Sequence, residues 1–152
     1  MAFSLGSCVG LSLFDRDAGV GALLHAQLPL SSSAPERART RPAMFVDSGV
    51  VYVLDELFAR GASRRRLVAC IAGAADSRRA DDVFQIGRRN HTVVRRILWK
   101  NDILIAAEDV GGSMPRTLVL EMASGRTSLR IGGHERELHR PAHLARGADH
   151  DL

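Results

Sequence analysis

Cys8 and His25 are the two side chains whose types and surroundings favour nucleophilic chemistry in this sequence. Cys8 lies among small residues in the segment LGSCVGLSLFD, and His25 lies in the apolar run VGALLHAQL. An imidazole close to a thiol can accept its proton, and the sulfur then attacks an electrophilic carbon. From the residues alone two other interpretations stay open, because Cys8 could be a small core residue and His25 a hydrogen-bonded core histidine.

A β-hairpin is the element that must bring these two side chains together. The segment DRDAG between the two runs is a turn signal. A two-residue loop at Arg16-Asp17 would place Cys8 opposite His25, with Cβ atoms about 4.5–5.5 Å apart. A three-residue loop would shift the register by one and separate the two side chains onto opposite faces. The spacing therefore permits a Cys8–His25 dyad without requiring it.

The residues around Cys8 are small, which is consistent with a nucleophilic role for this cysteine. Gly6, Gly10 and Ser12 would share its strand face and leave room for a substrate to approach the sulfur. Gly6 also frees the backbone just before the cysteine, so that N–H groups at Gly6 and Ser7 could face a developing oxyanion. Cys70, in the apolar run LVACIAG, has no acid–base partner nearby, and we assign it to the core.

The remaining pattern predicts an α+β domain, with the order β-β-α-β-α-β-β-β. The Ser-, Pro- and Arg-rich stretch 29–42 is typical of a mobile loop, and the chain beyond Gly132 is polar. We therefore divide the chain into a domain over residues 1–132 and a polar, disordered tail over 133–152. The other predicted elements are a helix from Pro42 to Gly61, a strand RLVACIAGA, a helix capped by Asn90, a strand DILIAAED, and a hairpin TLVLEMASGRTSLRI that turns at Ser124-Gly125.

Composition excludes several classes of function. The net charge of +4 comes almost entirely from arginine, but only 5% of the residues are aromatic, which disfavours a nucleic-acid surface. No apolar run approaches the ~20 residues of a membrane span. LGSC resembles a lipoprotein cleavage box, but it lacks the basic and apolar segments of a signal peptide, so we expect no lipid anchor. Two cysteines without a CxxC pair predict a cytoplasmic protein, and the tail histidines have no metal-binding spacing.

Six short motifs, in order from Leu5 to Ile131, resemble the chemoreceptor glutamine deamidases (CheD) of bacterial and archaeal chemotaxis. GSCVGLSLFD resembles the nucleophile segment of this family and HAQLP its histidine segment, while FVDSGV resembles the start of its first long helix. IAGAA stands where the family has a Gly-Gly pair, and Ala74 replaces the second glycine. IGRRN corresponds to Ile-Gly-x-Arg-Asn, and AEDVGGSMPR to an Ala-Glu-Asp-x-Gly-Gly loop.

The resemblance implies a specific activity. Members hydrolyse the side-chain amide of selected glutamines on the cytoplasmic helices of methyl-accepting chemotaxis receptors, with a cysteine that aligns with Cys8 and a histidine that aligns with His25. It also implies a sandwich of mixed β-sheets with helices outside, no cofactor and no metal, and a response-regulator phosphatase as a further partner. The family carries a threonine five or six residues before the cysteine; Phe3 and Ala2 occupy these positions here, and Ser4 is the nearest hydroxyl.

Two alternatives to a deamidase follow from the same residues. A degenerate member would act only as a binding module for a receptor or a phosphatase, and the absent threonine favours this alternative. The same dyad could also hydrolyse receptor glutamate methyl esters, because ester and amide carbons are similar electrophiles.

Overall fold

Two four-stranded β-sheets and three α-helices make up the part of the chain that the computed structural model describes, residues 1–76 and 84–142. One sheet has the strand order β3-β2-β4-β5 and the other has the order β1-β6-β7-β8. The elements are β1 (Ala2–Leu5), β2 (Val9–Asp15), β3 (Val20–Ala26), η1 (Ser31–Ser33), α1 (Pro35–Thr40), η2 (Pro42–Met44), α2 (Val46–Ala59), β4 (Val68–Gly73), α3 (Ile86–Lys100), β5 (Leu104–Val110), β6 (Arg116–Leu120), β7 (Thr127–Ile131) and β8 (His134–His139).

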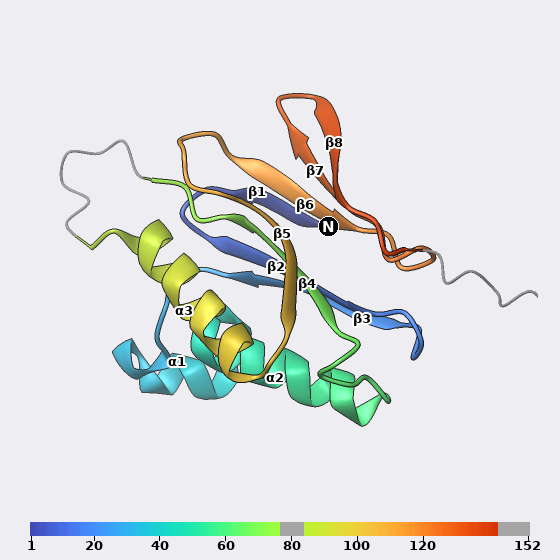
Figure 1. Cartoon of the computed structure of the whole chain (residues 1–152). Helices are drawn as coiled ribbons and strands as arrows, with labels where there is room; N and C mark the ends of the chain where they lie inside the picture. Colours follow the sequence, from blue (N-terminus) through green and yellow to red (C-terminus); the bar gives the residue numbers. More distant parts are fainter. Residues whose placement is uncertain (77–83, 143–152) are drawn as a thin grey trace, which may run out of the picture.

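The two sheets and the helices form three layers, with the β3-β2-β4-β5 sheet in the middle (Figure 1). Helices α2 and α3 cover one face of this sheet, and the second sheet lies on its other side. Strand β2 is antiparallel to both of its neighbours, whereas β4 and β5 are parallel and are connected through α3. The predicted α+β class, with mixed sheets and helices outside, is confirmed.

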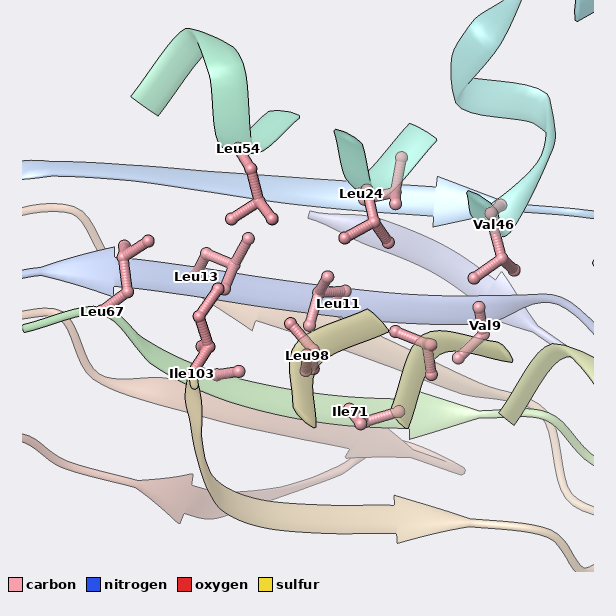
Figure 2. Packing of buried hydrophobic residues seen from close by; sticks show 14 of the residues in the cluster. Val9, Leu11, Leu13, Leu24, Val46, Leu54, Leu67, Ile71, Leu98 and Ile103 are labelled. Atoms are coloured by element: carbon pink, nitrogen blue, oxygen red, sulfur yellow. The ribbon is translucent and has the colours of Figure 1, made fainter. Parts of the chain in front are cut away.

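The main hydrophobic core lies between the middle sheet and the two long helices. Leu11 and Leu13 on β2 are fully buried and point toward the helices, where Leu54 and Leu98 meet them (Figure 2). Alternate residues of a strand point to opposite faces, so the intervening positions of β2 face the second sheet. Because each fully buried leucine stabilises the fold by about 1.5–3 kcal/mol, this layer holds the strand that carries the Cys8 segment.

The other face of β2 carries small residues, but it offers no space to a substrate. A Cβ atom on Gly10 would lie 2.6 Å from the Leu5 side chain and 3.2 Å from that of Leu118. Ser12 is buried, and its hydroxyl lies 3.1 Å from that of Thr127. The prediction that Gly10 and Ser12 leave room beside the sulfur is therefore wrong, because the second sheet fills this space.

The stretch 29–42, predicted as a mobile loop, instead forms the short helices η1 and α1 and leads into η2. Pro35 and Pro42 occupy the first positions of α1 and η2, where a missing N–H costs nothing. Asp47 accepts hydrogen bonds from both the N–H (2.8 Å) and the hydroxyl (2.9 Å) of Ser31. These contacts fix the segment on the start of α2.

Two strands lie outside the predicted order. Strand β1 pairs with β6, and its Leu5 side chain is fully buried. Strand β8 pairs with β7, which corrects the assignment of His134–His139 to a disordered tail. Residues 143–152 of that predicted tail lie outside the described residues. The remaining predicted strands and the β6–β7 hairpin are confirmed, but the connection spans residues 121–126 and is longer than the predicted turn at Ser124-Gly125.

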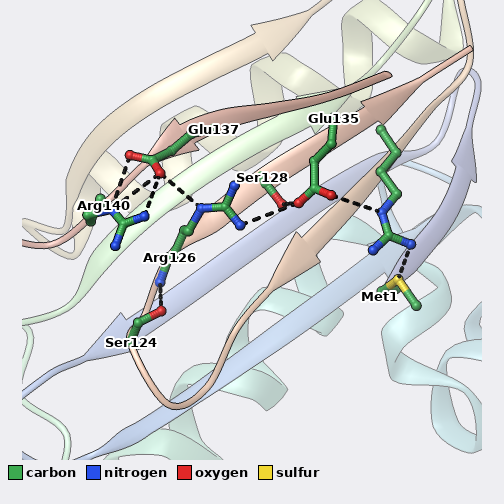
Figure 3. A network of polar contacts seen from close by, with 8 residues as sticks. Met1, Ser124, Arg126, Ser128, Glu135, Glu137 and Arg140 are labelled. Carbon is green, nitrogen blue, oxygen red and sulfur yellow. Dashed lines mark hydrogen bonds and ion pairs between the residues drawn. The ribbon is translucent and has the colours of Figure 1, made fainter. Parts of the chain in front are cut away.

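Apart from its backbone pairing with β7, strand β8 is attached to the sheet mainly through ion pairs of its charged side chains. Its sequence is therefore polar, which is why it was predicted as part of a disordered tail. Arg126 donates hydrogen bonds to Glu137 at 2.9 Å and to Glu135 at 3.4 Å, and the Ser128 hydroxyl donates to Glu135 at 3.0 Å (Figure 3). Arg140 extends this network to Glu137. A strand held by cross-strand ion pairs lacks the apolar alternation on which sequence patterns depend.

Within the described ranges, no helix combines the length and the apolar character needed to cross a bilayer.

Candidate functional site

The hairpin that carries the site has a longer turn than predicted. Residues 16–19 form a four-residue connection, so the predicted two-residue loop at Arg16-Asp17 is wrong. The Asp15 carboxylate accepts a hydrogen bond from the Ala18 N–H at 3.1 Å, and Gly19 adopts a φ of +65°. A side-chain-capped turn that ends on a left-handed glycine is stable, and it places Asp15 opposite Val20.

The longer turn shifts the register by two residues. His25 lies opposite Gly10, and not opposite Cys8 as predicted. Because side chains alternate along a strand, an even shift leaves the face of each side chain unchanged. Gly10 faces the second sheet, and Cys8 also packs against the second hydrophobic cluster, which includes Leu5 and Leu118. Cys8 and His25 therefore lie on the same side of the middle sheet, toward β1.

Cys8 itself lies in a turn between β1 and β2 rather than in a strand. The N–H of Ala75 donates to the Gly6 carbonyl at 2.8 Å, and the N–H of Ala74 donates to the Cys8 carbonyl at 2.7 Å. The end of β4 thus holds the turn at both of its ends. Ala74 adopts a φ of +50°, a conformation that costs an L-residue about 1–2 kcal/mol.

Asn90 holds the middle of this turn, although the sequence analysis predicted it as a helix cap. It lies inside α3, which begins at Ile86, and its side chain is fully buried. Its Nδ2 donates hydrogen bonds to the carbonyls of Ser7 and Gln27, each at 3.0 Å. One amide group therefore joins the turn that carries the cysteine to the end of the strand that carries the histidine.

The first turn of α3 approaches the end of β4 closely enough to make this link. A Cβ atom on Gly87 would lie 2.4 Å from the Ala75 carbonyl oxygen and 2.8 Å from that of Ala74. No real side chain fits at such distances, so only glycine permits this helix position. The motif IGRRN is the only signal in the sequence for this role of Asn90, and its residue types alone do not indicate which carbonyls the amide binds.

Partial desolvation shifts the pKa of both candidate catalytic groups in the direction that favours their neutral forms. Burial raises the pKa of the Cys8 thiol, and the Cys8 backbone N–H lowers that pKa by a smaller amount. His25 is exposed, but partial desolvation of its ring lowers its pKa below the ordinary histidine value. Among the described residues, no hydrogen bond joins the two side chains, and the imidazole has no hydrogen-bond partner.

Gly6 and Ser7 lie in the same turn as Cys8, but Ser4 and the second cysteine, Cys70, lie apart from the Cys8–His25 pair. Ser4 is exposed on β1, and its N–H bonds to Thr117 Oγ1 at 3.2 Å. It lines a different surface hollow, beside Arg130, and makes no described contact with His25. Cys70 is 2% exposed between the sheets, and burial raises the pKa of its thiol despite hydrogen bonds with neighbouring hydroxyls.

An open hollow of about 1110 Å³ has His25 and Gln27 in one wall. Arg37, Arg41 and Tyr52 also line this hollow. Over the ranges 1–76 and 84–142, no three His, Cys, Asp or Glu side chains lie close enough together to hold a metal ion. The hollow gives a substrate side chain access to His25, whereas Cys8 is not among the residues that line it.

Both a family model and individual relatives of known name match most of this chain. Residues 27–131 match the family model described as "CheD chemotactic sensory transduction". A protein of Solibacter usitatus named "Probable chemoreceptor glutamine deamidase CheD" is 46% identical over 136 residues, which are 90% of this chain and 80% of the relative.

Relatives from distant sources are similar over the same length. "Probable chemoreceptor glutamine deamidase CheD 2" of Anaeromyxobacter dehalogenans is 42% identical over 128 residues, 84% of this chain and 80% of the relative. A Thermococcus kodakarensis protein with the name "Probable chemoreceptor glutamine deamidase CheD" is 39% identical over 130 residues, again 84% and 80% of the two chains. With the family model covering more than half of its length, this chain belongs to the CheD family of chemotactic sensory transduction proteins.

Proposed function

We propose that this chain is a cytoplasmic glutamine deamidase that hydrolyses glutamine side chains on the helical regions of chemotaxis receptors, with Cys8 as nucleophile and His25 as acid–base group. Family membership and the names of the relatives support the activity. One observation supports the site assignment above all. The three consecutive carbonyls of the Gly6–Cys8 turn each accept a hydrogen bond, from Ala75, Asn90 and Ala74 in that order.

Those held carbonyls orient the N–H groups of the turn. In a trans peptide the carbonyl and the N–H point in opposite directions, and the described ranges contain no cis peptide. Since the Gly6 carbonyl points to the Ala75 N–H, the N–H of Ser7 points away from it. The Ser7 carbonyl points to the Asn90 side chain, so the N–H of Cys8 points away from that side chain.

These two N–H groups are suited to bind an oxyanion. Neither donates to a backbone carbonyl in the described part of the chain, and the Cys8 N–H lies beside its own sulfur. A tetrahedral intermediate on that sulfur would bring its negative oxygen close to both donors. Preorganised donors of this kind typically contribute about 10²–10³-fold each to the rate. The proposed donors are thus the N–H groups of Ser7 and Cys8. Ser7 keeps its predicted role, Gly6 contributes the carbonyl whose hydrogen bond orients the Ser7 N–H, and Ser4 has no part.

In the proposed reaction, the thiol of Cys8 and the imidazole of His25 are both neutral before the attack. His25 accepts the thiol proton as the sulfur of Cys8 attacks the amide carbon, and the resulting imidazolium gives that proton to the departing ammonia. Water, deprotonated by His25, attacks the thioester and releases glutamate and the free thiol. The raised pKa of Cys8 and the lowered pKa of His25 favour proton transfer during attack over a stable thiolate–imidazolium pair.

One observation favours the alternative of a binding module without activity. The imidazole of His25 has no hydrogen-bond partner among the described residues, so nothing there fixes its orientation. A histidine that acts as a base is usually oriented by a third group. In a working enzyme, the bound substrate must therefore restrict the ring.

The deciding experiment uses a receptor fragment with several glutamines and mass spectrometry of its peptides. Wild type should convert specific glutamines to glutamate, Cys8→Ala should convert none, and the matched Cys70→Ala variant should behave as wild type. Equal conversion by Cys8→Ala would overturn the assignment of the nucleophile. Receptor binding without conversion would favour the binding module, and release of methanol from a methylated fragment would identify a methylesterase.

We further propose, from the family resemblance, that a response-regulator phosphatase of the chemotaxis system binds this chain. Co-elution of the two purified proteins in gel filtration would support this partner. Separate elution at micromolar concentrations would exclude a stable complex.

A further inference from the structure

The hollow beside His25 has an unusual arrangement of charge. Arg37, Arg39 and Arg41 all line it, together with His25 and Gln27 from the β3 side. The three arginines come from five consecutive residues of the segment that the sequence pattern predicted as a loop. These three side chains, which we call the basic wall, therefore line the same hollow as His25.

This basic wall is poorly neutralised by the protein itself. Among the described residues, Arg37 and Arg41 form no ion pair. Arg39 lies 3.6 Å from Glu36, but both side chains are at least 75% exposed, so the pair is weak. At least two guanidinium groups beside the candidate site thus remain available to an anionic ligand.

The backbone holds the basic wall in place relative to His25. The N–H groups of Gln27 and Leu28, just beyond β3, donate to the Met44 carbonyl at 2.8 and 3.1 Å. Within the arginine segment, the Arg41 N–H donates to the Arg37 carbonyl at 2.7 Å. Arginine side chains on such a segment lose less freedom on binding than they would on a mobile loop.

We propose that Arg37, Arg39 and Arg41 bind carboxylates that flank the target glutamine, so that the chain prefers glutamines in acidic segments of the substrate helix. The proposal rests on the proposed function and specifies its substrate. Guanidinium groups bind carboxylates through paired, charge-assisted hydrogen bonds, and an acidic helix would also be steered toward the basic wall. A neutral or basic segment would gain neither effect.

A consequence concerns receptors with neighbouring glutamines. Deamidation of one glutamine creates a carboxylate, which then becomes a flanking charge for the next glutamine. The first conversion should thus accelerate the second, whereas a neutral methyl ester at the same position should not.

The test compares two synthetic receptor-helix peptides that contain one glutamine flanked either by aspartates or by asparagines. Wild type should show a KM about tenfold lower for the acidic peptide at low salt, with similar kcat, and the difference should shrink as salt is added. In the variant Arg37→Ala/Arg39→Ala/Arg41→Ala, the KM for the acidic peptide should rise to the KM for the neutral peptide, so that the preference is lost. Because all three side chains are exposed, the variant should fold normally.

A matched control removes three arginines at the other end of the middle sheet, with Arg60→Ala/Arg64→Ala/Arg65→Ala. These residues precede Arg66, which binds Asp15 at the far end of β2 from Cys8. The control variant has the same net charge and should keep the preference for the acidic peptide. Loss of the preference in both variants would mean that overall charge, and not the basic wall, selects the substrate.

Binding measurements separate this proposal from the proposed function. Fluorescence anisotropy of the two peptides with Cys8→Ala reports the charge preference without turnover. If wild type deamidates neither peptide but Cys8→Ala binds the acidic peptide more tightly, the proposed function is refuted. The inference that the basic wall binds acidic segments is then retained. Equal affinity for both peptides, or a preference that survives loss of the three wall arginines, would overturn the inference.

Discussion

Asn90 offers the most direct test of how this site is held together. Its Nδ2 donates the two hydrogen bonds that join the Ser7 and Gln27 carbonyls, and its side chain is fully buried. Asn90→Ala removes both bonds and leaves two carbonyls without these donors. At about 0.5–1.5 kcal/mol for each bond, we expect a loss of about 1–3 kcal/mol in the free energy of unfolding.

Asn90→Ala should reduce the rate of deamidation by more than its loss of folding stability would suggest. Without Asn90, the middle of the Gly6–Cys8 turn is free to move relative to the strand that carries His25. A misplacement of about 1 Å between reacting groups can reduce a rate about 10²-fold. We therefore expect kcat/KM for deamidation to fall about 10²-fold, mainly through kcat, because the arginines that bind substrate lie elsewhere.

A second asparagine on the same helix provides the control. Asn101 follows the last turn of α3, where its Nδ2 donates to the Ile97 carbonyl at 2.8 Å. Asn101→Ala should lower the free energy of unfolding by about 1 kcal/mol and leave kcat unchanged. Urea unfolding and deamidation kinetics, measured at a temperature at which each variant is folded, would separate the two effects.

Two results would refute this reasoning. Wild-type kcat in folded Asn90→Ala would show that the turn keeps its conformation without the link. Equal losses of kcat in Asn90→Ala and Asn101→Ala would show that activity follows the general stability of α3. Alkylation by iodoacetamide gives an independent measurement, because a freed turn should change the reactivity of Cys8 in Asn90→Ala alone.

Three further predictions follow from burial and pKa. At neutral pH, iodoacetamide should alkylate Cys8 before Cys70, which is 2% exposed, and the reverse order would exchange their roles. Because the pKa of His25 is lowered and only neutral imidazole accepts a proton, kcat/KM should fall on the acid side with a midpoint below about 6.5; a midpoint above 7 would contradict this. Burial alone would raise the pKa of Asp15, but hydrogen bonds led by that from Arg66 lower it. Asp15→Asn should thus cost about 2 kcal/mol in urea unfolding at neutral pH, a difference that shrinks below about pH 4 as wild-type Asp15 is protonated.

The hairpin shows what the sequence could and could not predict about the site. Two apolar runs around DRDAG were sufficient to predict the hairpin, but they left open whether Cys8 and His25 lie on the same face of the sheet. The turn length was wrong, because the segment supports either a two-residue loop or the observed four-residue turn capped by Asp15. The error of two residues preserved the face, since side chains alternate with a period of two.

Asn90 shows a different kind of failure. Local pattern places a cap before the first apolar residues of a helix, and Asn90 precedes Val93 and Val94. The helix in fact starts at Ile86, five residues before the predicted start, and the partners of the Asn90 side chain are far away in the chain. A buried amide that bridges two distant carbonyls leaves no periodic signal, so only the family motif pointed to it.

The supporting residues explain why motifs far from Cys8 accompany the nucleophile segment in the family resemblance. Gly73, in IAGAA, adopts a φ of +91°, and a Cβ atom there would lie 2.5 Å from the Cys8 carbonyl oxygen. Gly87, in IGRRN, permits the approach that brings Asn90 to the turn. Each motif thus supplies backbone space or a donor that the Cys8 turn needs. Substitutions at these glycines should therefore impair the nucleophile as strongly as substitutions beside it, although the chain separates them by more than sixty residues.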